Sequence, residues 1–385
     1  MELLRRQAEK TMRHRARRGS SDTQMDLMKS FGIFCVVYAH CFTHGFRFFG
    51  RGLVSSVYVI QLFIFCAGYF YHTEQDASPA AGFLKKCCVS YLLPFFVWNF
   101  IYGAAYNVLA LIMGLRFGSP LSLYTLLIQP WLDNEQFMLN LPAWFLLSLF
   151  LVAMVQWAVR RILARFGSGG LLRDLILLFV YFAGSVAAVW LGGAKEHHGP
   201  FSMLLRLMVL LPYYQLGILY RAHRGRLPRW AGVPVILAGC AILFLWGGGL
   251  GTKMLYARFT GSPAWIVAAT ACAVLVAAEL CRLAAPLLRR SQTVFLLGRS
   301  TMYIMLHHLF VIWCIHAALL LVNQAAPLPG FDPAAFQSGI WYRYTAGHPA
   351  LLVLYLAAGL AIPAGFHLVY EQVLLRLGRS RTPAA

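Results

Sequence analysis

Two ionisable side chains, Lys29 and His40, occupy the first strongly apolar segment of the chain. They are eleven positions apart, and at about 100° per residue both fall on nearly the same face of a helix. At about 1.5 Å per residue, His40 lies on the order of 16 Å further along that helix. If the helix spans a membrane, His40 lies near the middle of a hydrocarbon core about 30 Å thick, where ionisable side chains are costly and by default functional.

A neutral imidazole at that depth can act as a general base toward a hydroxyl, because imidazole exchanges protons near neutral pH. A core histidine satisfied by one hydrogen bond is the simpler alternative. Asp26, three residues before Lys29, can pair with it or serve as an acidic residue near a helix N-terminus. His44 follows His40 by one turn, but no further ligands are spaced for a metal site, so we expect no metal.

The composition indicates a membrane protein. The 385 residues are 60% hydrophobic and 12% charged, whereas soluble domains carry about 25% charged residues. A net charge of +20 could indicate nucleic-acid binding, but the basic residues fall between apolar segments. We therefore expect the lipid bilayer, and no nucleic acid, as a partner. The nine cysteines form no Cys-x-x-Cys framework and are interpreted as small hydrophobic residues.

About ten apolar segments must position Lys29 and His40, and we expect an all-α polytopic membrane protein with about ten transmembrane helices. The segments are approximately 28–46, 53–72, 86–113, 142–163, 171–191, 203–220, 231–250, 264–284, 292–322 and 349–375. Basic residues alternate between their connections with a bias of about three to one, which predicts that both termini are cytoplasmic. The expected division is a basic tail (1–24), a membrane domain (25–376) and a C-terminal tail (377–385).

Further candidates lie at the ends of these segments. Tyr69 is either a polar site group or an interface aromatic, and Trp144 is either an interface anchor or a site wall. Lys85 and Lys86 set topology or contact phosphates, and Arg299 stands near the cytoplasmic end of the ninth segment.

Two adjacent histidines, His307 and His308, point to different faces of a helix. At most one should face a site, and the other needs a partner of its own. The outer connections 114–141 and 323–348 carry aromatic residues such as Trp341. These either line an acceptor site or anchor the chain at the interface. The pair Ala67-Gly68 predicts a close helix approach.

In their order and spacing, these features resemble the membrane-bound acyltransferase-3 family over about residues 22–375. The resemblance is carried by Asp26, Lys29 to His40, the Phe-rich Gly-Tyr segment 63–70, Lys86 followed by Pro94, Trp144-Phe145, and the Leu-Gly to His308 segment. It implies an inner-membrane O-acyltransferase that uses cytoplasmic acyl-CoA, with acetyl as the expected group. The implied acceptor is a hydroxyl of a carbohydrate, such as an exopolysaccharide, a lipid-linked repeat unit or a lipopolysaccharide sugar.

The resemblance also implies roles for residues. His40 is the expected catalytic base, while Asp26 and Lys29 order the cytoplasmic mouth and Lys29 attracts the phosphates of the donor. Arg299, Lys85 and Lys86 are weaker candidates for the same attraction, and His308 lines the cavity or orients His40. Many members carry Arg-x-x-Arg before the third span. This chain has Lys86-Cys87-Cys88-Val89-Ser90 there, and only Lys86 of that stretch is basic.

Two other classes of function fit the same residues. A polysaccharide transporter or flippase would use His40 as a proton relay, and a structural subunit would tolerate changes at Lys29 and His40. Polysaccharide synthesis or export machinery is an expected partner. Consumption of the thioester distinguishes a transferase from a transporter.

Overall fold

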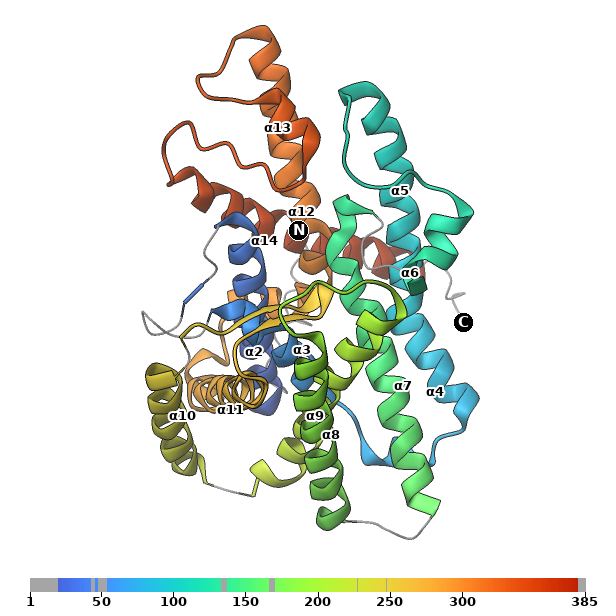
Figure 1. Ribbon diagram of the computed structural model, residues 1–385, viewed down its shortest axis with the longest axis vertical. Coiled ribbons are helices and arrows are strands. Elements are labelled where there is room, and N and C mark those ends of the chain that lie inside the picture. Colours follow the sequence, from blue (N-terminus) through green and yellow to red (C-terminus); the bar gives the residue numbers. More distant parts are fainter. Residues whose placement is uncertain are drawn as a thin grey trace.

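The computed structural model describes residues 20–42, 46–47, 54–132, 137–165, 170–226, 228–246 and 248–379. Helices dominate this part of the chain, and they form one bundle with a small β-hairpin (Figure 1). The predicted site residue His44 lies outside the described residues.

The described helices follow one another along the chain, most of them after short connections. They are α2 (Ser20–Cys41), α3 (Val59–Tyr69), α4 (Ala80–Cys87), α5 (Leu93–Met113), α6 (Gln129–Leu132), α7 (Trp144–Arg165), α8 (Leu171–Gly192), α9 (Gly199–Arg224), α10 (Val233–Trp246), α11 (Pro263–Leu288), α12 (Gln292–Ala325), α13 (Pro333–Ser338) and α14 (Leu351–Arg379). Two strands, β1 (Gly251–Lys253) and β2 (Arg258–Thr260), pair antiparallel with Lys253 opposite Arg258.

Among the described residues, seven helical segments are long and apolar enough to cross a membrane. They are Ala80–Met113, Met138–Arg165, Leu171–Gly192, Gly199–Arg224, Pro263–Leu288, Gln292–Ala325 and Leu351–Val373. The protein is therefore a multi-pass, mainly helical membrane protein, as predicted. Three of the ten expected segments are not among them: 28–46, which begins within α2, and two that form shorter helices, α3 with 11 residues and α10 with 14. The count of ten and the cytoplasmic termini therefore remain predictions.

The span Ala80–Met113 contains a π-helical turn, Cys88–Leu92, directly before α5. Pro94 follows this turn. Proline has no backbone N–H to donate, and its ring clashes with the carbonyl one turn earlier. A π turn is one of the local adjustments that accommodate such a break in a helix, and here it places α4 and α5 in one continuous span.

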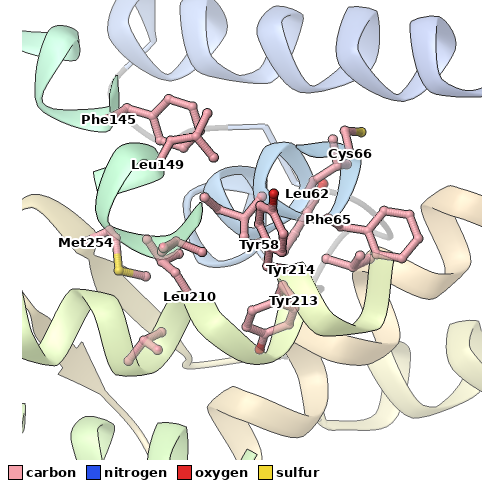
Figure 2. Close-up of a cluster of buried hydrophobic side chains, with 14 of the residues drawn as sticks. Tyr58, Leu62, Phe65, Cys66, Phe145, Leu149, Leu210, Tyr213, Tyr214 and Met254 are labelled. Atoms are coloured by element: carbon pink, nitrogen blue, oxygen red, sulfur yellow. The ribbon is translucent and has the colours of Figure 1, made fainter. Parts of the chain in front are cut away.

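Helix α3 crosses α9 with the two backbones in contact. A Cβ atom on Gly68 would overlap the carbonyl oxygen of Tyr214, and one on Gly217 would overlap that of Phe65. Small residues permit such approaches between membrane helices, so the approach predicted at Ala67-Gly68 is confirmed. Figure 2 shows the surrounding core, in which α3 residues lie among side chains of α7 and α9.

Helices α2 and α12 lie side by side and run in the same direction. Near their beginnings, the Ser30 hydroxyl lies 3.1 Å from the carbonyl oxygen of Val294, and a Cβ on Gly298 would contact Asp26. Further along, His40 meets His308. We call the end of α2 that carries Asp26 and Lys29 the Lys29 end, and the end that carries His40 the pocket end.

The connection 326–350 folds over the pocket end. It is held by a second hydrophobic cluster, in which Phe331, Phe336 and Tyr344 are buried. The side chain of Gln337 donates to the carbonyl of Met113 at 2.9 Å, which ties α13 to the end of α5. In Figure 1, α13 and the end of α5 both lie at the top of the bundle.

Candidate active site

The imidazoles of His40 and His308 are hydrogen-bonded to each other across α2 and α12. Nδ1 of His40 lies 2.7 Å from Nε2 of His308, and the rings are nearly parallel. Nδ1 of His308 lies 2.8 Å from the carbonyl oxygen of Ile304. A carbonyl only accepts, so Nδ1 of His308 carries the proton and its Nε2 is the acceptor. Nδ1 of His40 must then be the donor, which leaves Nε2 of His40 with its lone pair.

The neighbouring His307 has a different partner. Its Nδ1 lies 2.6 Å from the hydroxyl of Tyr102, and its ring contacts Trp98 of α5. The two adjacent histidines thus face different elements and have different partners, as helical geometry predicts.

The connection 326–350 supplies two residues to the same place. The ring of Trp341 lies 5.4 Å from that of His40, and Nε of Arg343 donates to the carbonyl oxygen of His40 at 3.1 Å. Nη1 of Arg343 donates to the carbonyls of Ile340 and Tyr342, each at 2.7 Å. Burial lowers the pKa of the Arg343 guanidinium to about 10, so it remains a cation at neutral pH.

A third histidine of α12, His316, holds this connection in place. Its Nδ1 lies 2.8 Å from the carbonyl of Ile312, as His308 does with Ile304. Its Nε2 therefore accepts, and it receives the backbone N–H of Tyr344 at 3.1 Å. His316 is fully buried and has both ring nitrogens satisfied, which assigns it a structural role.

His40 lines a pocket of about 450 Å³, within the usual size range for small-ligand sites. Its walls come from α2, α3, α7, α12, the connection 326–350 and the hairpin. Aromatic side chains are frequent among them, and they are Phe63, Trp144, Phe145, Tyr256 and Trp341. Trp144 is among the residues that line this pocket, and the guanidinium of Arg206 lies 5.2 Å from its ring.

The hairpin is fastened at the rim of the pocket. The hydroxyl of Thr252 donates to the carbonyl of Ser56 at 2.8 Å, and the N–H of Phe259 donates to Gly193 at 2.7 Å. The carbonyl of Tyr256 accepts from the N–H of His197 at 2.8 Å. These contacts hold the turn Met254–Tyr256 against the pocket.

Charged side chains cluster beside the hairpin. Oε1 of Glu196 lies 2.8 Å from Nζ of Lys253 and 3.2 Å from Nη1 of Arg258. The hydrogen bond from Lys253 contributes most to a lowered pKa of the Glu196 carboxyl, so this carboxylate is ionised. Lys253 lines the pocket, and its side chain is 58% exposed.

The Lys29 end holds a separate group of predicted residues. Nζ of Lys29 lies 2.9 Å from Oδ1 of Asp26, which confirms that the two pair. It also lies 5.8 Å from the ring of Phe70. The adjacent Tyr69 is contacted by the guanidinium of Arg221, which donates to its carbonyl at 3.2 Å. Tyr69 therefore belongs to the Lys29 end and lies away from His40.

The remaining basic candidates are placed differently. Arg299 pairs with Glu371 at 2.6 Å, close to Asp26 because Gly298 packs against it. Lys85 and Lys86 are exposed in the last turn of α4. In the described part of the chain, no hydrogen bond or ion pair joins either lysine to Asp26, Lys29 or His40.

Binding of a metal ion at His40 would need several ligating side chains gathered around it. Within the ranges that the structure describes, no group of three or more His, Cys, Asp or Glu side chains could hold a metal ion. The hydrogen bond between His40 and His308 occupies Nδ1 of His40 and Nε2 of His308.

One protein-family model matches almost the entire chain. The family model for acyltransferase-3, described as an acyltransferase domain, matches residues 22–368. The chain belongs to the acyltransferase-3 family. The match includes both the Lys29 end and every element that lines the His40 pocket. This acyltransferase-3 protein is thus a multi-pass membrane acyltransferase. Searches of curated proteins and of solved structures gave no match.

Sequence reasoning did not find several residues of this site. Arg343, Lys253 and Tyr256 lie in connections, where neither periodicity nor spacing marks a residue as part of a site. Only their basic and aromatic character on one side of the predicted membrane offered a signal. His308 was placed among the candidates, and the structure supplies its contact with His40.

Proposed function

We propose that this acyltransferase-3 protein moves an acyl group, acetyl, from acyl-CoA to a hydroxyl of a carbohydrate, with His40 as the general base. The protein acts in the inner membrane, with the Lys29 end toward the cytoplasm, as the distribution of basic residues predicts. Acceptors of this class are exopolysaccharides, lipid-linked repeat units and lipopolysaccharide sugars.

The observation that carries this proposal is the chain of hydrogen bonds from Ile304 through His308 to His40. It assigns the protons so that Nε2 of His40 keeps a lone pair, and His40 lines a pocket large enough for a sugar. A base needs a free lone pair and a fixed ring orientation. A residue that only filled the core would need neither.

The reaction then balances as follows. Nε2 of His40 takes the proton of the acceptor hydroxyl while the hydroxyl oxygen bonds to the thioester carbonyl carbon. The carbon–sulfur bond breaks, and the proton passes from Nε2 to the departing CoA sulfur. His308 orients the ring throughout, because its Nε2 continues to accept from Nδ1 of His40.

The donor is recognised at the Lys29 end. Lys29 attracts the phosphates of CoA, and Asp26 sets the position of its ammonium group 2.9 Å away. Lys85, Lys86 and Arg299 strengthen the same field, with Arg299 partly neutralised by Glu371. The acyl group must reach His40 over the distance of about 16 Å that separates the two along α2.

The test uses the full chain in lipid nanodiscs with acetyl-CoA and polysaccharide isolated from a host strain that lacks the gene. Wild type should release free CoA and acetylate the polymer, and His40→Ala should lower turnover by about 10²–10⁴-fold. A transporter would consume no thioester. If His40→Ala retained turnover while Lys29→Ala lost it, His40 would not be the base.

In the host, the same pair of variants identifies the acceptor. A deletion strain complemented with wild type should regain one O-acetyl signal on its surface or exported polysaccharide, and the strain with His40→Ala should not. Unchanged acetylation with altered polymer export would favour the flippase alternative, with His40 as a proton relay.

A further inference from the structure

The side chains at the rim of the His40 pocket are suited to recognising the acceptor. It joins three aromatic side chains from three separate elements, Trp144 of α7, Tyr256 of the hairpin turn and Trp341 of the connection 326–350. Aromatic faces pack well against the C–H face of a sugar ring, because both surfaces are flat and weakly polar. Side chains held on three elements can fix one orientation of such a ring.

The elements that carry these aromatic residues are held in place by separate contacts. Trp144 lies under the guanidinium of Arg206, and Tyr256 is tied by its carbonyl to His197. Trp341 stands two residues before Arg343, which is bonded to His40 itself. The aromatic wall is therefore built into the fold, as a binding site needs its first contacts to be.

One cation stands in the wall of this pocket. Lys253 lines the pocket while its ammonium group remains accessible to water. It shares the single carboxylate of Glu196 with Arg258, its cross-strand partner. Two cations and one anion leave one positive charge in excess at the rim. In the proposed orientation this end faces away from the cytoplasm, where topology calls for no basic residues.

We propose that the acceptor is an anionic carbohydrate, whose acidic group is bound by Lys253 while its sugar ring lies against Trp341 and Tyr256. This inference rests on the proposed function and names the class of its acceptor. A carboxylate of a uronic acid or a phosphate on a sugar supplies the same charge to Lys253. With the acidic group at the rim, a hydroxyl of the same or the adjacent sugar unit reaches Nε2 of His40.

Arg258 provides a matched control. It pairs with the same carboxylate from the opposite strand and carries the same charge, but it is not among the residues that line the pocket. Loss of either charge changes the field of the cluster equally. Only loss of Lys253 removes a group from the pocket wall.

The experiment measures binding by calorimetry, with the full chain in nanodiscs and without acyl-CoA. Its probes are cellobiose, cellobiouronic acid and cellobiose 1-phosphate. Wild type should bind at least one acidic probe about tenfold more tightly than cellobiose, as one charge-assisted hydrogen bond at a partly exposed site provides. The preferred acidic probe identifies carboxylate or phosphate. Lys253→Gln should abolish the preference, whereas Arg258→Gln and Lys253→Arg should retain it.

Three results would overturn the inference: no binding of either acidic probe, equal binding of cellobiose and both acidic probes, or equal loss in Lys253→Gln and Arg258→Gln. Unchanged binding of cellobiose by Lys253→Gln shows that its result is not a folding defect, and retained preference in Lys253→Arg assigns the effect to the positive charge. Failure of the proposed function is distinguishable, because His40→Ala should still prefer the acidic probe. If the preference is present but no CoA is released in the turnover assay, the result supports an anionic carbohydrate ligand and contradicts acyl transfer from acyl-CoA.

Discussion

Nδ1 of His40 lies 2.7 Å from Nε2 of His308, although 268 positions separate the two residues in the chain. The carbonyl of Ile304 determines that Nδ1 of His308 is protonated. Nε2 of His308 in turn determines that the proton of His40 is on Nδ1. The protonation of the candidate base is thus set by the backbone of another helix.

Replacing His308 by glutamine should lower kcat by at least about tenfold, but by less than the full ~10²–10⁴-fold of a general base. The glutamine can still accept from His40, but the bond to Ile304 that fixes His308 is lost. The KM for acetyl-CoA should not change. His307→Gln is the control, because His307 contacts Tyr102 and not His40. Equal loss of kcat in both variants would assign His308 to packing alone.

Replacing Lys29 by alanine should raise the KM for acetyl-CoA about 5- to 10-fold with a smaller effect on kcat, because the phosphates lose a partly exposed cation. The wild-type KM should rise with salt, and the variant should lose part of this dependence. Lys195→Ala removes the same charge at the pocket end and should leave the donor KM unchanged. A donor KM unaffected in Lys29→Ala would place the phosphates elsewhere.

Replacing Gly68 by alanine should destabilise the protein by about 1–3 kcal/mol or more, because the added methyl group overlaps the backbone of α9. The measurement is thermal unfolding of the purified chain, followed by size-exclusion chromatography. Gly365→Ala is the control, since a Cβ there meets no atom within 4 Å. That change should be neutral or slightly stabilising. Equal unfolding temperatures for the two variants would contradict the backbone contact of α3 with α9.

Replacing Arg343 by alanine should loosen the connection 326–350. The side chain donates to the carbonyls of His40, Ile340 and Tyr342. Loss of these three hydrogen bonds should speed amide hydrogen exchange in that connection by about 10- to 100-fold, as expected for hydrogen bonds from a charged group. Turnover should fall as well, because Trp341 is carried by the same connection. Arg116→Ala, an exposed arginine at the same end, should leave exchange unchanged; unaltered exchange in Arg343→Ala would show that other contacts suffice.

Local features of this site could be predicted from the sequence. The pair Asp26–Lys29 follows from a spacing of three on a helix, and the divergence of His307 and His308 follows from helical geometry. The approach at Gly68 follows from residue size. In each case the rule connects residues that are close in sequence or share one helix.

The rest depends on contacts between distant segments, which no local rule specifies. The partner of α2 is α12, and the wall of the pocket includes a hairpin of ten residues, 251–260, and a long connection. From the sequence, Lys253 and Arg343 are therefore recognised only as basic residues in connections between spans. The sequence predicts Tyr69 as a binding residue but not its position, and the contact of the adjacent Phe70 with Lys29 assigns it to the Lys29 end.

The geometry of His308 recurs two turns later in His316, which turns its Nε2 toward the N–H of Tyr344. Helix α12 therefore helps to position two groups: the imidazole of His40, through His308, and the connection that carries Trp341, through His316. If α12 tilts within the bilayer, both contacts move with it, while Arg343 ties the same connection to the backbone of α2. Bilayer thickness and lipid composition, which change helix tilt, should therefore move the base and Trp341 together and leave their mutual alignment largely intact.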